Sequence, residues 1–431
     1  MAPPWTSTLR PRPTTTTTAY ITIGAISISV GILLGSLIAQ SACRPRKTKC
    51  IPSPLESLPP DAENTSLPYP PHILPGSRDV STPYGTIKVF EWGPPAGEKV
   101  LLMHGISAPC LTLANAAEEL VSKGYRVMLF DFFGRGYSDA PADVPYDSRL
   151  YASQILLVLA SSPLAWTGDD GFHLVGYSLG GGVAVSFARY FGHMVRSLVL
   201  VAGAGLIRRG HVGWRSRVLY EDGWLPEWVR EGMVRRRIAP AGRQGETEVD
   251  EAGMAGEEVR EEGREEGREE GREEGRQRNS DASGGDSYDN ALLLKGSPGL
   301  TVSSVLAWQL KFHRGFVPAF MSSIRHAPIY ERREDWLALG KLLAARREGV
   351  LVEGTEGSVL LPPPGLRGGR VLLVLGTSDT VIVQEELIHD ATAVLGEDGF
   401  EAVLLDCGHE IIMTKAVEVA NVAANFWKAT T

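Results

Sequence analysis

Cysteine is scarce in this chain, with four among 431 residues. Their spacing fits neither a disulfide framework nor a four-thiolate zinc site. Cys110 and Cys407 lie in segments typical of a buried core, where a free thiol behaves as a small hydrophobe. Cys43 and Cys50 follow a long apolar run, and could be lipidated on a cytosolic side or paired on a lumenal one.

An excess of positive charge is also lacking. The chain has 43 Lys and Arg against 51 Asp and Glu, a formal net charge of -8. Nucleic-acid binding normally requires a basic patch or stripe, so we expect no nucleic-acid partner. Much of the acidity falls in one repeat, EEGREEGREEGREEGR at 261–276, and therefore says little about a substrate.

This repeat has no apolar side chain that could pack against a core. Gly at every fourth position costs a helix about 1 kcal/mol each relative to Ala. We therefore predict that residues 241–290 are disordered. A charged helix that binds a partner is the alternative.

Hydrophobic runs long enough to cross a bilayer are confined to one place, residues 19–42, which contain no charged residue. About 20 apolar residues span a membrane, so we predict a transmembrane anchor after a short tail at 1–18. A cleaved signal peptide is the competitor, because Ala39 and Ser41 form a small-residue cleavage site. The run exceeds the usual length of a signal-peptide core, which favours the anchor.

The anchor predicts a single-pass membrane protein, whose orientation follows from the flanking charges. The heavier cluster of Lys and Arg, at 44–49, follows the run, which by the positive-inside rule places the catalytic part in the cytosol. A glycosylation sequon at Asn64 would require the lumenal side instead. Residues 43–80 are rich in Pro, Ser and charge, and we interpret them as an extended linker.

Beyond the linker, apolar runs typical of strands alternate with helical stretches. The runs lie at 88–92, 99–105, 126–131, 172–177, 197–203, 370–376 and 401–406. Several are unbroken, as in strands covered on both faces. This alternation predicts an α/β fold with a mostly parallel, doubly wound sheet.

Residues 206–369 interrupt the alternation and divide the predicted core into 81–205 and 370–431. We interpret this segment, called the insertion below, as a helical lid or cap that includes the disordered stretch. It contains many large aromatic side chains, which could line an apolar tunnel or pack the lid helices together. They are Trp214, Trp224, Trp228, Trp308, Phe312, Phe316 and Phe320.

The pattern G-x-S-x-G occurs at 176–180, between a predicted strand and a predicted helix. In that context it predicts a sharp turn that exposes Ser178 as a nucleophile, with Gly176 and Gly180 allowing the chain to fold tightly. The helix N-terminus would favour a developing oxyanion. The alternative is a glycine-rich turn with an idle serine.

A nucleophilic serine needs a base, and the base needs an orienting acid, in the chain order Ser, acid, His for this type of sheet. Asp379 and His409 each follow a predicted strand, at the edge where open α/β sheets place their sites. Asp379 could instead serve as a helix cap or turn residue. Asp406 is the rival acid, but we expect it on the strand before His409.

Two backbone N–H groups are candidates for an oxyanion hole. The residue after the nucleophile, Leu179, supplies the first. The second should come from the loop after the strand at 99–105, which His104-Gly105 opens, so Ile106 is the candidate. An ordinary turn with Gly105 as its breaker is the alternative.

Together these residues resemble the α/β-hydrolase superfamily over about 81–427, with 206–370 matching only as a lid position. The motifs are HG at 104–105, DFFGRGYSD at 131–139, GYSLGG at 176–181, GTSD at 376–379 and GH at 408–409. The set is most similar to the lipase and esterase branch that includes monoacylglycerol lipases, and to carbon–carbon bond hydrolases. Its serine nucleophile differs from the aspartate of epoxide hydrolases and haloalkane dehalogenases.

The resemblance implies a serine hydrolase that cleaves a carboxylic or lipid ester through an acyl-enzyme, without a metal or organic cofactor. The membrane anchor at 19–42 and an apolar lid favour a lipid ester. Cleavage of a carbon–carbon bond, thioester or amide by the same triad is one alternative. A non-catalytic binding protein is another, although the intact Ser178, Asp379 and His409 argue against it.

Overall fold

The computed structural model describes only part of the chain, and all of the described residues except Lys49 belong to a unit that spans Cys50–Thr431. The described residues are 49–57, 67–169, 171–211, 219–220, 226–240, 285–349 and 365–430. The predicted anchor at 19–42, the sequon at Asn64 and most of the predicted disordered stretch lie outside them. Among the described helices, none combines the length and the apolar character needed to span a bilayer.

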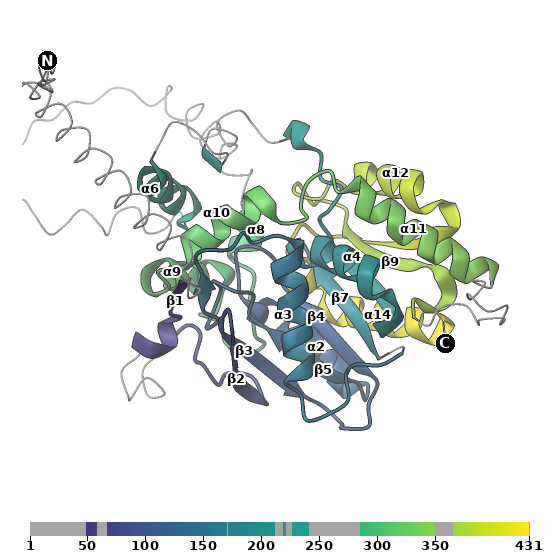
Figure 1. Cartoon of the computed structure of the whole chain (residues 1–431), viewed down its shortest axis with the longest axis horizontal. Helices are drawn as coiled ribbons and strands as arrows, with labels where there is room; N and C mark the ends of the chain where they lie inside the picture. Colours follow the sequence, from purple (N-terminus) through teal and green to yellow (C-terminus); the bar gives the residue numbers. More distant parts are fainter. Residues whose placement is uncertain are drawn as a thin grey trace, which may run out of the picture. The chain divides into compact units, whose positions relative to one another are not determined.

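The centre of this unit is an eight-stranded sheet in the order β10-β9-β8-β7-β4-β5-β3-β2 (Figure 1). Its strands are β2 (Ser77–Thr82), β3 (Gly85–Trp92), β4 (Lys99–Met103), β5 (Arg126–Phe130), β7 (Phe172–Tyr177), β8 (Val195–Val201), β9 (Val371–Gly376) and β10 (Phe400–Leu405). Neighbours from β10 to β5 are parallel, whereas β3 and β2 join antiparallel. The predicted mostly parallel α/β sheet is confirmed.

The unbroken apolar runs form the strands that are covered on both faces. Every residue of β7 and of β9 is buried. The edge strand β2 was not predicted, because its sequence SRDVST contains one apolar residue and is half exposed. It forms by pairing antiparallel with β3 along its full length.

The helices between the strands form two contiguous groups. They are α2 (Ala114–Ser122), α3 (Ser148–Ala160), α4 (Leu179–Phe191), α11 (Arg333–Glu348), α12 (Gln384–Leu395), α13 (Ile411–Thr414) and α14 (Ala416–Thr430). Helix α4 contacts α3 and α11, and α11 contacts α12, whereas α14 contacts α2 and α13. Because the central strands are buried on both sides, the two groups cover opposite faces of the sheet.

The segment 43–80, interpreted as an extended linker, packs against the core at both of its described ends. Residues Cys50–Ile51 (β1) pair with Ala140–Pro141 (β6). Tyr69 is fully buried and donates a hydrogen bond of 2.9 Å to the Asp131 carboxylate. An aromatic ring whose hydroxyl group is hydrogen-bonded packs well in a core. The Pro-rich composition around Tyr69 gives no sign of this burial.

The described part of the insertion is helical, as predicted. It contains α6 (Glu227–Ile238), α8 (Asp286–Asp289), α9 (Val302–Phe312) and α10 (Phe316–His326). The predicted range 206–369 also includes α11, which instead packs with α4 and α12 over the sheet. Helix α8 falls at the end of the stretch predicted to be disordered, and its Tyr288 is buried. Trp308, Phe316 and Phe320 are also buried, whereas Trp228 is 75% exposed and Phe312 43% exposed.

The insertion leaves and rejoins the core at one point after β8. Ile207, near its start, and Tyr330, between α10 and α11, form a parallel β-bridge. The Gly205 N–H donates to the Ile329 carbonyl at 2.8 Å, and the Arg332 N–H donates to the Gly205 carbonyl at 2.7 Å. These bonds join the two segments of chain that connect the helices α6 to α10 of the insertion to the core.

Candidate active site

Ser178 lies between β7 and α4 with an unusual backbone conformation, φ 52° and ψ -120°. A non-glycine residue in this region is strained and persists only where its surroundings hold it. Here the Ser178 N–H donates to the Val201 carbonyl at 3.1 Å. The Ser178 carbonyl accepts from the N–H groups of Gly181 and Ala204 at 2.8 and 2.9 Å. The sharp turn predicted from G-x-S-x-G is therefore present.

The two glycines that flank the turn are required by close backbone approach. A Cβ on Gly176 would lie 2.3 Å from the Gly180 carbonyl oxygen. A Cβ on Gly180 would lie 2.4 Å from the Met103 carbonyl oxygen, at the end of β4. The tight fit places Ser178 beside the loop that follows β4.

His409 joins Ser178 to Asp379 through its two ring nitrogens. His409 Nε2 lies 3.0 Å from Ser178 Oγ, across 231 residues of sequence. His409 Nδ1 lies 2.8 Å from Asp379 Oδ2. The exposed fractions of Ser178, Asp379 and His409 are 9%, 6% and 6%. The structure thus brings the three predicted side chains into one nearly buried chain of hydrogen bonds.

Asp379 also fulfils the alternative role predicted for it, that of a turn residue. Its Oδ1 accepts from the N–H groups of Val381 and Ile382 at 2.8 and 2.9 Å. These bonds fix the carboxylate so that Oδ2 faces His409. The rival acid Asp406 was expected on the strand before His409, but it follows β10, which ends at Leu405. It is exposed and accepts a 3.4 Å hydrogen bond from Thr377.

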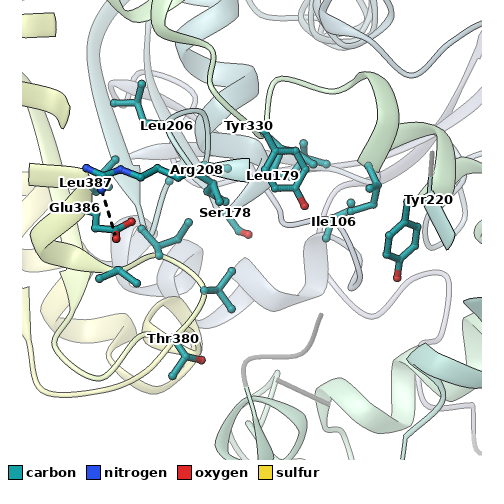
Figure 2. A pocket seen from close by; sticks show the side chains of 18 of the residues that line it. Ile106, Ser178, Leu179, Leu206, Arg208, Tyr220, Tyr330, Thr380, Glu386 and Leu387 are labelled. Carbon is teal, nitrogen blue, oxygen red and sulfur yellow. Dashed lines mark ion pairs between the residues drawn. The ribbon is translucent and has the colours of Figure 1, made fainter. Parts of the chain in front are cut away.

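The serine opens into a pocket of about 300 Å³ with a mainly aliphatic and aromatic lining. In Figure 2, Ser178 lies between Ile106 and Tyr220 on one side and Arg208 and Glu386 on the other. Leu179, the other predicted oxyanion donor, lines the same pocket. Both candidate donors therefore belong to residues that border the cavity of Ser178.

Residues 99–416 match the family model described as alpha/beta hydrolase fold. The chain belongs to the α/β-hydrolase family. The matched range extends from β4 to the first residue of α14 and includes Ser178, Asp379 and His409.

Individual relatives match this chain over limited lengths. An uncharacterized protein of Mycobacterium bovis is 29% identical over 171 residues, 40% of this chain and 48% of that protein. Lipase 1 of Psychrobacter immobilis is 32% identical over 120 residues, 28% of this chain and 36% of the lipase. The chain thus spans about half the length of the first relative and about a third of the second.

The fold also resembles a solved carboxylesterase structure from Bacillus subtilis, with a TM-score of 0.51 and 15% sequence identity. The alignment covers 84% of this chain and 94% of the carboxylesterase. At this identity, the likeness supports the fold and nothing beyond it.

In this α/β hydrolase, His104 is a buried, neutral side chain that holds two loops of the core. Burial lowers the pKa of His104 to about 3, so its ring is neutral. Its Nε2 accepts from the Phe132 N–H at 2.8 Å. Because Nε2 accepts, the proton is on Nδ1, which donates to the Gly105 carbonyl at 2.7 Å. His104 is therefore fully engaged in joining the loops after β4 and β5.

Three further side chains contact Ile106 and Ser107, and the sequence analysis gave none of them a role. They are Arg135, Tyr288 and Gln309. Arg135 lies within the DFFGRGYSD motif, and Gln309 is the only amide side chain of α9. A buried amide in a mainly apolar helix is a signal that could have identified Gln309. In the described part of the α/β hydrolase, no group of three or more His, Cys, Asp or Glu could hold a metal ion.

Proposed function

We propose that this α/β hydrolase is a serine ester hydrolase with Ser178 as nucleophile, His409 as general base and Asp379 as the orienting acid. One observation carries the proposal: His409 Nε2 lies 3.0 Å from Ser178 Oγ while its Nδ1 lies 2.8 Å from Asp379 Oδ2. These are hydrogen-bond distances that allow proton transfer between a nucleophile and its base.

The mechanism follows from these contacts. His409 Nε2 removes the Ser178 proton as Oγ attacks the acyl carbonyl, and Asp379 stabilises the imidazolium that forms. The N–H groups of Leu179 and Ile106 hold the tetrahedral oxyanion, where loss of one donor typically costs about 10²–10³-fold in kcat. The imidazolium protonates the departing alcohol. Water then cleaves the acyl-enzyme in the same manner and releases the carboxylic acid.

The pocket supports an ester of an apolar acid as the substrate. Its lining includes Phe320 and Ile324 from α10 and Leu387 from α12. Its volume of about 300 Å³ is at the lower end of the roughly 300–1,000 Å³ of ligand pockets. Acyl groups of short or medium length fit that volume better than long ones. The lipase among the relatives favours the same substrate class.

The membrane location is a separate part of the proposal. The uncharged run at 19–42 would anchor the protein as a single-pass membrane protein, and the basic cluster at 44–49 would keep the catalytic unit cytosolic. The insertion would act as the lid over the pocket. Alkaline carbonate extraction tests the anchor, because an integral protein stays in the membrane pellet. Protection of the catalytic unit from protease in sealed microsomes would contradict the cytosolic side.

A fluorophosphonate probe and a series of esters of rising acyl length test the catalytic proposal. We expect wild type to be labelled and Ser178→Ala to lose labelling and turnover. Ser197→Ala is the matched control, since Ser197 Oγ lies 2.7 Å from His173 Nδ1 but on strand β8, away from the pocket. Labelling that survives in Ser178→Ala would refute the nucleophile.

The same measurements distinguish the alternatives. Labelling of wild type without turnover of any ester would favour carbon–carbon bond, thioester or amide cleavage by the same triad. Absence of labelling in a folded wild-type protein would favour a non-catalytic binding protein.

A further inference from the structure

We propose that two residues of the insertion, Gln309 and Tyr288, are positioning residues that hold the oxyanion loop, residues 105–107, in its working geometry. The inference rests on the proposed function, because it concerns the loop that supplies the Ile106 N–H. It assigns the insertion a part in the chemistry besides that of covering the pocket.

The three carbonyl groups of the oxyanion loop each accept a hydrogen bond from a different side chain. The Gly105 carbonyl accepts from His104 Nδ1 at 2.7 Å. The Ile106 carbonyl accepts from Arg135 Nε at 3.1 Å. The Ser107 carbonyl accepts from Gln309 Nε2 at 2.9 Å. Since a peptide unit is planar and joins the carbonyl of one residue to the N–H of the next, the bond to the Gly105 carbonyl sets the direction of the Ile106 N–H. The bonds to the Ile106 and Ser107 carbonyls hold the next two peptides of the loop, and so limit how far the first can turn.

Gln309 is the contribution of helix α9 to this arrangement. Its side chain is fully buried, and its Oε1 accepts from the Gly136 N–H at 2.8 Å. One amide group therefore bridges the loop after β4 and the loop after β5. Both ends of this buried amide are satisfied, so neither loop can shift without leaving a buried polar group unpaired, which is unfavourable.

Tyr288 contacts the site from helix α8. Its hydroxyl lies 3.0 Å from Ser107 Oγ, and its ring centroid lies 5.8 Å from that of His409. The side chain is 5% exposed. A single residue of the insertion thus borders both the oxyanion loop and the proposed base.

Arg135, in the loop after β5, bonds to both the oxyanion loop and the insertion. It is fully buried, and its Nη2 donates to Ser323 Oγ on α10 at 2.7 Å. The guanidinium that holds the Ile106 carbonyl is therefore itself bonded to the insertion. Three helices of the insertion, α8, α9 and α10, are connected to residues 106–107 directly or through one side chain.

A positioning role has a specific kinetic signature. An oxyanion donor acts in the transition state, 2.7–3.1 Å from the oxyanion, and contributes little to substrate binding. Misplacing the loop should therefore lower kcat and leave KM nearly unchanged. We expect Gln309→Met to lower kcat by about tenfold or more, below the roughly 10²–10³-fold cost of removing a donor outright. Tyr288→Phe should have a smaller effect of the same kind.

The test measures kcat, KM, thermal stability and the affinity of a trifluoromethyl ketone analogue of the substrate in each variant. We expect the affinity for this analogue to fall by the same factor as kcat/KM, while affinity for the product carboxylate stays unchanged. Tyr146→Phe is the matched control, since the buried Tyr146 hydroxyl has no hydrogen-bond partner among the described residues.

A double-mutant cycle of Tyr288→Phe with Ser107→Ala tests whether Tyr288 affects kcat through its contact with Ser107 Oγ. If Tyr288 acts through Ser107 Oγ, the double variant should be no slower than the slower single variant. Unchanged analogue affinity in both Gln309→Met and Tyr288→Phe, or fully additive effects in the cycle, would overturn the inference. Tyr288→Phe removes one oxygen atom, so the inference stays testable if Gln309→Met fails to fold. If wild type lacks Ser178-dependent turnover, the proposed function fails instead.

Discussion

The hydroxyl group of Tyr177 donates a hydrogen bond of 2.8 Å to the backbone carbonyl of His409. Tyr177 directly precedes Ser178, so this bond connects the peptide of the proposed nucleophile to the loop of the proposed base. The Tyr177 ring also lies 5.3 Å from the imidazole, tilted by 34°. His409 is therefore held twice, through its backbone by Tyr177 and through its ring by Asp379.

We expect Tyr177→Phe to lower kcat several-fold and to destabilise the fold by about 1–3 kcal/mol, since the His409 carbonyl would lose its partner in a buried site. Chemical denaturation and steady-state kinetics on the same preparations measure both effects. A variant that is destabilised but retains full kcat would mean that the bond supports the fold and does not position the base.

Asp379→Asn should lower kcat on the order of 10⁴-fold, as loss of the orienting carboxylate does in other serine hydrolases, because the amide favours the wrong tautomer of His409. The Asn carbonyl can still accept the bonds from Val381 and Ile382, so we expect the turn to survive. The control is Asp406→Asn, at an exposed position directly before the CGHE segment at 407–410. Equal losses in both variants would contradict the assignment of the acid.

Gly180→Ala should destabilise the protein by roughly 1–3 kcal/mol, because the new methyl group would lie 2.4 Å from the Met103 carbonyl oxygen. Gly232→Ala in α6 is the matched control, because a Cβ there meets nothing within 4 Å. We expect the control to stabilise its helix by about 0.5–1 kcal/mol. Thermal unfolding of the two variants compares them, and a neutral Gly180→Ala would mean that β4 and α4 can move apart.

His313 predicts a specific pH dependence of stability. Burial, with a contribution from the Arg135 charge, lowers the pKa of His313 from 6.5 to about 4. Between these two values the unfolded imidazole binds a proton and the folded one does not. The unfolding free energy therefore falls as pH falls through this window, by at most about 1.4 kcal/mol per pH unit for this residue.

His313→Gln should remove this contribution, since Gln does not titrate and can donate to the Ser138 carbonyl, which now accepts from His313 at 3.0 Å. Denaturation between pH 4.5 and 6.5 should show a shallower pH dependence in the variant. His104, whose pKa is also lowered, titrates in both proteins and cancels in the comparison. Identical slopes would show that folding does not lower the pKa of His313.

Most of the fold could be predicted because it depends on local patterns. The runs that became β7 and β9 are apolar throughout, and such runs form strands that are covered on both faces. The meeting of Ser178, Asp379 and His409 could be predicted because parallel strands end at one edge of a sheet. Their catalytic roles stay predictions until the variants are measured.

What could not be predicted depends on contacts between distant segments. Tyr288 lies in a stretch of Ser, Gly and Asp with no hydrophobic periodicity, and its burial follows from the packing of α8 onto the core. Tyr69 lies in Pro-rich sequence, and its burial follows from contacts with Asp131, Tyr137 and Trp308 far along the chain. Gln309 bonds to backbone atoms, and Arg135 bonds to two backbone carbonyls and to Ser323. Sequence spacing does not indicate a backbone partner.

The position of the insertion between β8 and β9 also governs the order of folding. Strands β2 to β8 all precede the insertion, so their pairing needs no later part of the chain. Val199 of β8 pairs with Leu372 of β9 across the whole insertion, and such distant pairing forms slowly. We therefore expect the turn at Ser178 to form during synthesis before Asp379 and His409 leave the ribosome. Hydrolytic competence would be among the last properties that the nascent chain acquires.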